Sequence, residues 1–161
     1  MSDRPPAARP RTPEGEGGSD GAGAGGGPVV GEVIRRVPPR HCDAQGMMHA
    51  SRPAEYFEDA FLAWLDAACA GYANLRAAGT DLVIAETTIR YLAPARLGDD
   101  VAARATPIER GRRSFLVRFD LIRGDGEVLV TATTGYVCVG PSGTVPIPPV
   151  LVHALAGTHV R

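Results

Sequence analysis

The 161-residue sequence contains no lysine, so all 17 of its basic residues are arginine. They are balanced by 18 acidic residues, and the formal net charge of −1 provides no overall attraction to nucleic acid or to an anionic membrane. Any contact with a phosphate group must therefore be made by arginine, whose forked guanidinium suits phosphate well. The composition predicts neither a nucleic-acid partner nor a membrane partner.

Cysteine is scarce as well. The three cysteines, Cys42, Cys69 and Cys138, are odd in number and widely separated. This spacing fits neither a disulfide framework nor a zinc site. We therefore interpret the cysteines as packing residues.

Long apolar runs are also missing. No stretch reaches the roughly 20 consecutive apolar residues that a membrane-spanning helix needs. The N-terminal region lacks the apolar core of a secretory signal peptide. We therefore expect a cytoplasmic protein.

Large apolar side chains are absent from residues 2–27, which consist mainly of Gly, Pro, Ala and Arg. Such a segment cannot bury enough apolar surface to offset the entropy of ordering. The sequence predicts a disordered tail over residues 1–28, with a docking arm as the alternative. It further predicts one folded domain over residues 29–145. The C-terminal segment, residues 146–161, could form a short helix.

Apolar periodicity predicts one long helix and a sheet. From Arg52 to Ala77 apolar side chains recur at helical spacing, and Pro53 suits the first turn of a helix. From Phe115 to Leu121 apolar and polar side chains alternate, as in a half-buried strand. The predicted strands are Val29–Val37, Leu82–Leu92, Asp100–Arg110, Arg112–Arg123 and Glu127–Val139, and the predicted C-terminal helix is Val150–Ala156.

This order of elements predicts an α+β fold in which one long helix is wrapped by a five-stranded antiparallel sheet. A single unit of this kind leaves a sheet edge and a sheet face uncovered. Pairing between the edges of two copies is an economical way to cover them. We therefore expect a homodimer or a homotetramer, with the loop before the helix next to a second subunit.

The junction between the first strand and the helix carries the main functional signal. Asp43 and Gly46 form a tight glycine turn just before the predicted helix. A helix N-terminus offers unpaired N–H groups and a partial positive charge. A carboxylate facing such groups is arranged for chemistry on a carbonyl, because the N–H groups polarise the oxygen while the carboxylate attacks the carbon or activates water.

Four segments together resemble a known family. They are Asp43–Gly46, Tyr56–Glu58, Ile89–Asp99 and Gly111–Phe115. In combination they resemble the hotdog-fold acyl-CoA thioesterases of the 4-hydroxybenzoyl-CoA thioesterase type. The resemblance covers roughly Val29–Val139, and it implies a hotdog fold and hydrolysis of an acyl thioester.

The resemblance also implies catalytic roles. Asp43 occupies the position of the catalytic carboxylate, and the backbone N–H of Ala50 occupies the position that polarises the thioester carbonyl. Gly46 is expected to supply a positive φ for the turn. His49 is a candidate to hydrogen-bond the thioester or a water, or to tune Asp43, with a pocket-lining role as the alternative. Asp43 could act as a nucleophile through a mixed anhydride or as a general base on water.

The side chains that follow Asp43 are candidates for binding the acyl group. Met47 and Met48 would form an adaptable apolar wall, although ordinary core packing is the alternative. They stand where many relatives carry an aromatic residue or an Asn-Asn pair. Tyr56 and Glu58, on the helix, are further substrate-binding candidates, and the alternative for Glu58 is an exposed charge.

Four arginines are candidates to bind the phosphates of CoA. They are Arg90, Arg96, Arg112 and Arg113. We favour the Arg112–Arg113 pair, because it matches the arginine- and serine-containing turn of the family. Solvated strand and turn charges are the alternative for each of them.

Several alternatives stay open at the level of function. The thioester could be carried by a carrier protein of a polyketide or fatty-acid pathway instead of CoA. The chain could also be a non-catalytic acyl-binding or assembly module. His41, Asp43 and His49 do not have a recognised metal-ligand spacing. We expect no metal and no cofactor, with CoA only as part of the substrate.

Overall fold

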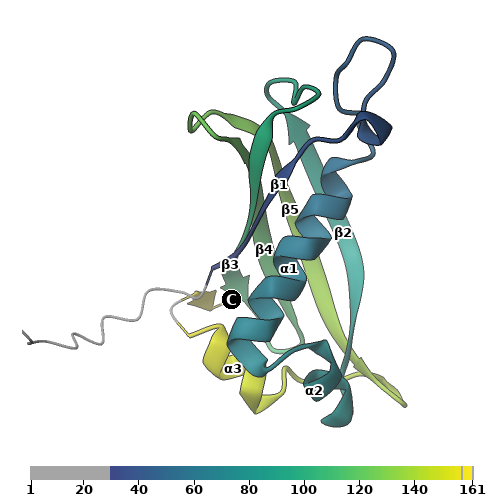
Figure 1. Cartoon of the computed structure of the whole chain (residues 1–161). Helices are drawn as coiled ribbons and strands as arrows, with labels where there is room; N and C mark the ends of the chain where they lie inside the picture. Colours follow the sequence, from purple (N-terminus) through teal and green to yellow (C-terminus); the bar gives the residue numbers. More distant parts are fainter. Residues whose placement is uncertain (1–29, 157, 161) are drawn as a thin grey trace, which may run out of the picture.

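The computed structural model describes residues 30–156 and 158–160, so the tail predicted over residues 1–28 lies outside the described residues. A curved antiparallel sheet wraps around helix α1, Pro53–Cys69 (Figure 1). The five long strands are β1 (Gly31–Arg36), β2 (Asp81–Tyr91), β3 (Asp100–Arg110), β4 (Ser114–Arg123) and β5 (Val128–Gly140). The short elements are η1 (Pro39–His41), α2 (Tyr72–Ala77), β6 (Gly143–Thr144), α3 (Pro149–Ala154) and β7 (His159–Val160).

The five long strands follow the spatial order β1-β3-β4-β5-β2, and all of their pairings are antiparallel. The two-residue strands β6 and β7 add to β5 and β3. Strand β2 follows the helices in sequence, and within the described part of the chain it pairs with β5 alone, which leaves its other side as an edge of the sheet. The predicted order of strand, helix and four antiparallel strands is confirmed.

Helix α1 lies against the concave face of the sheet because most of its large apolar side chains face that way. Trp64 and Leu65 are fully buried, and Phe57 stacks on Phe119 of β4 with ring centroids 5.2 Å apart. Phe61 stacks on Tyr136 of β5 at 4.2 Å. Aromatic pairs at such distances add stabilisation beyond the burial of their surface.

Gly31 of β1 permits the closest approach of helix and sheet. A Cβ atom at this position would lie 2.1 Å from the Ala60 carbonyl oxygen and 2.6 Å from the Trp64 Cβ. Any side chain here would therefore push α1 away from β1. The glycine sets the distance between the two elements, and with it the place of the helix N-terminus.

The prediction of a single helix over Arg52–Ala77 is wrong. Helix α1 ends at Cys69, and Ala70 and Gly71 both adopt positive φ, of 58° and 91°. The Gly71 N–H donates to the Leu65 carbonyl, which is the closure typical of a helix C-terminus. Two consecutive positive φ values are incompatible with a helix, so the chain turns and begins α2 at Tyr72.

The turn after α1 brings Tyr72 to the start of β2. Its hydroxyl hydrogen-bonds the Asp81 carboxylate and accepts the Leu82 N–H at 3.2 Å. Leu75 of α2 is fully buried, which fixes this short helix on the core. No helix among the described residues combines the length and apolarity needed to cross a membrane.

Candidate functional site

The loop between Cys42 and Met48 is a small hairpin that precedes α1. The Asp43 N–H donates to the Met47 carbonyl at 2.8 Å, and the Gly46 N–H donates to the Asp43 carbonyl at 3.0 Å. Gly46 has φ of 72°, a conformation that a side chain disfavours, as the turn in the sequence led us to expect. The local sequence therefore determines the shape of this loop.

The Asp43 carboxylate is held by the turn that it begins. Its Oδ1 accepts the N–H of Gln45 at 2.8 Å and the N–H of Met47 at 3.1 Å. Its Oδ2 accepts no hydrogen bond from any residue within 30–156 and 158–160. One carboxylate oxygen is thus fixed by backbone donors, and the other is exposed and available to a substrate or a water.

A neighbouring segment fixes the loop from one side. The Met48 N–H donates to the Ala95 carbonyl at 2.7 Å, and the Leu97 N–H donates to the Gly46 carbonyl at 3.0 Å. Arg123 supports that segment, because its guanidinium donates to the Pro94 carbonyl at 3.0 Å. The Asp43 loop is consequently attached to the rest of the fold by backbone hydrogen bonds.

Ala50 lies three residues before the first residue of α1. Its N–H donates to no acceptor in the part of the chain that the structure describes. Its carbonyl accepts the Tyr91 hydroxyl at 2.6 Å, which fixes this peptide against the end of β2. The free N–H near the positive end of the helix dipole is suited to polarise a carbonyl oxygen.

His49 lies between the loop and Ala50, and its side chain is exposed. Its Nδ1 lies 2.9 Å from the Ser51 hydroxyl and 3.4 Å from the Ser51 N–H, which makes Nδ1 an acceptor. Its backbone N–H donates to the His41 carbonyl at 2.8 Å. A direct role of the imidazole in catalysis stays a prediction.

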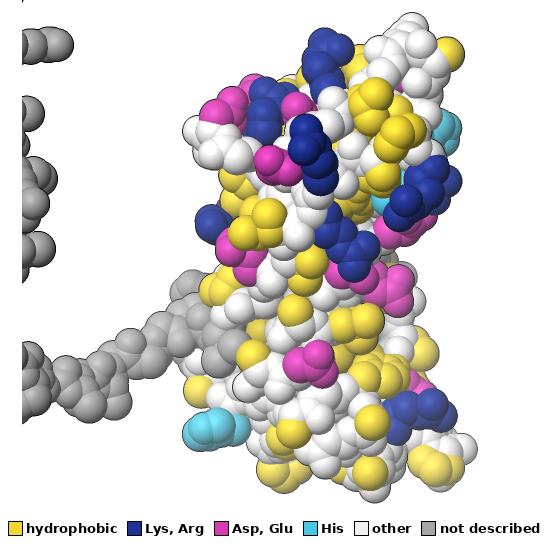
Figure 2. Space-filling model, viewed as in Figure 1, with side chains coloured by type: hydrophobic (Ala, Val, Ile, Leu, Met, Phe, Trp, Pro, Cys, Tyr) yellow, Lys and Arg dark blue, Asp and Glu magenta, His cyan; other side chains and the backbone are white. Residues whose placement is uncertain are grey.

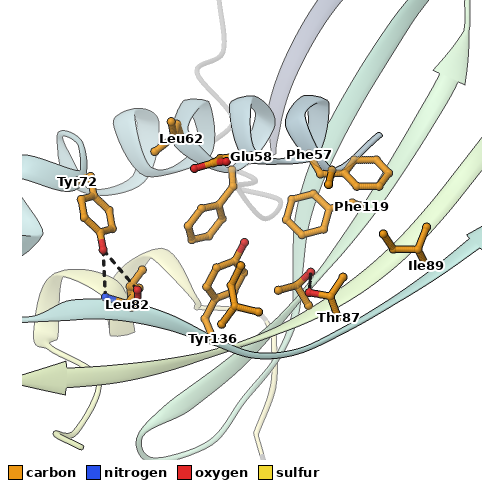
Figure 3. A pocket seen from close by; sticks show the side chains of 13 residues that line it. Phe57, Glu58, Leu62, Tyr72, Leu82, Thr87, Ile89, Phe119 and Tyr136 are labelled. Carbon is orange, nitrogen blue, oxygen red and sulfur yellow. Dashed lines mark hydrogen bonds between the residues drawn. The ribbon is translucent and has the colours of Figure 1, made fainter. Parts of the chain in front are cut away.

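A cavity of about 450 Å³ runs along α1, between this helix and the strands β2 and β5 (Figure 3), and none of its lining residues belongs to the Asp43 loop. Its wall is mostly apolar and aromatic, with a few polar groups. The lining residues are Ala54, Phe57, Glu58, Phe61, Leu62, Tyr72, Leu82, Ile84, Thr87, Ile89, Phe119, Thr134 and Tyr136. Such a cavity suits an apolar group that carries a small number of polar atoms.

The wall of this cavity includes the phenol of Tyr136 and the side chain of Glu58. Figure 3 shows the Tyr136 hydroxyl pointing toward α1, which carries Glu58. Burial and the Glu58 carboxylate both raise the pKa of Tyr136. The phenol therefore remains a neutral hydrogen-bond donor throughout the physiological pH range. Glu58 lies in the cavity wall, and its role in binding a substrate stays a prediction.

A second cavity of about 290 Å³ lies next to the Asp43 loop. Met48 and Pro53 form the side that belongs to the loop and to the first turn of α1. Its other residues are Tyr91, Leu92, Ala93, Pro94, Ala95 and Val130. Of the two methionines predicted to line a pocket, Met48 lines this one, whereas Met47 forms an isolated β-bridge with Arg96.

Charged side chains gather at the loop end of the molecule. Figure 2 shows most of the visible arginine and acidic side chains in the half that carries the Asp43 loop, and a more apolar surface in the other half. Arg96 is exposed beside Met47, and its guanidinium has no partner among the residues described. It is the candidate phosphate ligand that the fold brings to the Asp43 loop.

The favoured pair Arg112–Arg113 lies elsewhere. It joins the end of β3 to the start of β4, whereas the Asp43 loop adjoins the opposite ends of these strands, near Asp99 and Arg123. Within one chain the pair is therefore remote from Asp43. Arg90 lies between two residues that line the cavities, Ile89 and Tyr91, so strand alternation directs its side chain to the other face of the sheet.

Tyr56 has a different setting from the other predicted substrate ligands. It is only 2% exposed, and its hydroxyl lies 2.9 Å from the Nδ1 of His41. It is not among the residues that line the two cavities described above. The described residues contain no group of three or more His, Cys, Asp or Glu side chains that could hold a metal ion.

Comparison with known sequences identifies one family. The sequence model of a family described as the thioesterase-like superfamily matches residues 37–155. The match includes the Asp43 loop, α1 and all strands from β2 to β6. No curated protein matches this chain.

Solved structures share the fold. A 1,4-dihydroxy-2-naphthoyl-CoA thioesterase from Synechocystis superposes with a TM-score of 0.72 at 20% identity, covering 80% of this chain and 96% of that one. A Staphylococcus aureus protein in complex with CoA superposes with a TM-score of 0.72 at 14% sequence identity, covering 80% of this chain and 85% of that one. A hypothetical protein from Thermus thermophilus superposes with a TM-score of 0.70 at 28% sequence identity, covering 78% of this chain and 98% of that one.

Proposed function

Because this chain belongs to the thioesterase-like superfamily, we propose that it hydrolyses an acyl thioester with Asp43 as the catalytic carboxylate. One observation carries the proposal. The Asp43 carboxylate is fixed through Oδ1 in a turn just before α1, while its Oδ2 and the Ala50 N–H have no partner among the described residues. A thioester bound between them would meet both a base or nucleophile and a hydrogen-bond donor.

In the proposed reaction the thioester carbonyl oxygen accepts the Ala50 N–H. The negative charge that develops on this oxygen in the transition state is stabilised by the N–H group and by the helix dipole. Asp43 then either attacks the carbonyl carbon, giving a mixed anhydride that water opens, or removes a proton from the attacking water. Both routes consume one water and release a free acid and a thiol.

The larger cavity is the proposed site of the acyl group. Its volume of about 450 Å³ and its aromatic wall suit an apolar or aromatic acyl chain. CoA is the proposed carrier. The Staphylococcus aureus structure in complex with CoA and the CoA thioester substrate of the Synechocystis enzyme support it. The Arg96 guanidinium beside the loop, which has no partner within residues 30–156 and 158–160, supports it as well.

A second copy of the chain is part of the proposal. The free edge of β2 carries exposed apolar side chains, among them Val83 and Ile84, with Tyr91 and Leu92 at its end. If two copies pair along β2 in antiparallel fashion, the two-fold axis reverses the strand direction. The Arg112–Arg113 turn of the second copy would then lie at the Asp43 end of the first.

The direct test is a thioester panel assayed by release of free thiol. We expect the wild-type chain to release CoA from at least one acyl-CoA much faster than the uncatalysed reaction. The same acyl group should be offered on CoA and on a carrier protein, because faster release from the carrier protein would assign the substrate to that class. Binding of acyl-CoA without any hydrolysis across the panel would refute the proposal and favour an acyl-binding module.

A further inference from the structure

A buried polar pair connects the Asp43 loop to helix α1. His41 is 7% exposed and Tyr56 is 2% exposed. The Nδ1 of His41 lies 2.9 Å from the Tyr56 hydroxyl, and the two rings meet edge to face with centroids 5.6 Å apart. Tyr56 was predicted to bind the substrate and His41 was not among the predicted site residues, and neither lines the two cavities described above.

His41 also closes the base of the loop through its backbone. Its carbonyl accepts the His49 N–H at 2.8 Å, so the two ends of the loop meet at this residue. Its N–H donates to the Pro38 carbonyl at 3.0 Å within η1. The base of the loop is therefore attached to η1 through the backbone and to α1 through the imidazole.

The other ring nitrogen of His41 continues this connection. Its Nε2 lies 3.7 Å from the Glu55 carboxylate, which forms an ion pair with Arg52 directly before α1. This arrangement favours one tautomer, in which Tyr56 donates to Nδ1 and the Nε2–H faces Glu55. The neutral imidazole thus accepts a hydrogen bond from Tyr56 and directs its N–H toward Glu55, and both of these residues lie in the first turn of α1.

We propose that the His41–Tyr56 pair positions the Asp43 loop against α1, and so sets where the carboxylate stands relative to the Ala50 N–H. The proposal rests on the proposed function of Asp43. His41 contributes no atom to the reaction and acts only through the geometry of the loop. Small displacements of a reacting group can reduce turnover by about 100-fold, so a buried hydrogen bond at the base of the loop can control the rate.

The pair should respond to acid. Burial is the main cause that lowers the pKa of His41. The guanidinium groups of Arg40, Arg52 and Arg35 lower this pKa further, and the Glu55 carboxylate raises it. An imidazolium can no longer accept the hydrogen bond of the buried phenol beside it. Acid should therefore loosen the base of the loop.

Protonation of His41 should reduce the stability of the folded state, because a lowered pKa means that the folded chain binds this proton more weakly than the unfolded chain does. As the pH falls below about 6.5, the unfolded chain binds a proton at His41 before the folded chain does. The stabilisation from the neutral imidazole is therefore complete above that pH and is lost as the pH falls through the lower pKa of the folded state. The thermal midpoint should depend less on pH between about 7.5 and about 5 in His41→Asn than in the wild type.

Tyr56→Phe tests the pair directly, because it removes the hydroxyl and keeps the ring. We expect kcat to fall about tenfold or more, with KM within about twofold. Hydrogen exchange of the Asp43 and His49 amides, which close the loop, should become several-fold faster. Unchanged kcat and unchanged exchange would overturn the proposal.

His41→Asn is the conservative rescue, because its amide can still hydrogen-bond Tyr56 but does not titrate. We expect it to retain most of kcat. The control is His153→Asn on the exposed surface of α3, which should leave the hydrogen exchange of the loop amides unchanged. Full activity in Asp43→Asn would overturn the proposed function, and the exchange measurement alone would then decide whether the pair fixes the loop.

Discussion

At the scale of single residues, two aspartates that each accept the N–H of the second residue after them differ in their surroundings. Asp43 accepts the N–H groups of Gln45 and Met47, and Asp125 likewise accepts the Glu127 N–H at 3.0 Å. Asp125 lies in the hairpin turn between β4 and β5, close to the Arg123 guanidinium at 3.8 Å. Asp43 instead lies in the loop that leads into α1. The proposed reactivity therefore comes from position in the fold and not from the turn itself.

Arg96 is the residue for which the structure changes the expectation most. It was one of four arginine candidates for the phosphates of CoA, and it alone stands beside the Asp43 loop with an unpaired guanidinium among the described residues. Arg96→Gln should raise KM for an acyl-CoA by about tenfold and leave kcat nearly unchanged, because a charge-assisted contact to the non-reacting part of the substrate is lost.

The control for this prediction is Arg118→Gln. Arg118 is an exposed arginine paired with Asp120 on β4. Steady-state kinetics with one acyl-CoA would compare the two variants. An equal rise in KM for both, or no rise for either, would remove Arg96 from the substrate site.

The sequence predicted those site features that depend on local structure. The glycine turn fixes the backbone at Gly46, so the place of the Asp43 loop before a helix could be read from neighbouring residues. The contact between His41 and Tyr56 spans fifteen residues and could not be predicted, because it depends on how η1 lies against α1. The bridge between Met47 and Arg96 likewise depends on the packing of distant segments.

At the scale of secondary-structure elements, the close contact of α1 with β1 decides where the helix N-terminus stands. Strand periodicity predicted the strands to within a few residues, because alternation reports a buried face directly. The end of α1 was missed, since Ala70 gives no sign in the sequence that it will adopt a left-handed conformation. The distance between helix and sheet depends on Gly31, which local patterns cannot assign.

Gly31→Ala tests this contact. A Cβ 2.1 Å from the Ala60 carbonyl forces α1 away from β1, and such overpacking costs about 1–3 kcal/mol. We expect the free energy of unfolding to fall by that amount in urea denaturation. Gly124→Ala is the matched control, because its Cβ would meet its nearest neighbour at an ordinary 3.6 Å. Equal stability of the two variants would contradict the packing described here.

At the scale of the whole molecule, the fold of one chain does not bring all of the proposed substrate ligands to one site. The predicted membership in a thioesterase superfamily is confirmed by the family match over residues 37–155, whereas the 4-hydroxybenzoyl-CoA type stays a prediction. Arg112–Arg113 lies at the opposite end of the sheet from Asp43. The pair can serve the site only if a second copy brings it there.

We therefore predict that the protein is at least a dimer in solution. Light scattering should give a mass of at least twice the 16.8 kDa of the chain. The specific activity should fall on dilution as the dimer dissociates, because each site needs the second copy. A monomer with full activity at every concentration would exclude the shared site, although it would leave the role of Asp43 open.

The central claim is that the negative charge of Asp43 drives the cleavage of a thioester, and Asp43→Asn tests it most directly. Asparagine keeps an oxygen that can accept the Gln45 and Met47 N–H groups, so the loop should survive the change while the charge is lost. We predict that kcat for thiol release falls by at least about 100-fold, with an unchanged thermal midpoint, whereas Asp125→Asn retains wild-type turnover. Near-wild-type turnover by Asp43→Asn would contradict the account.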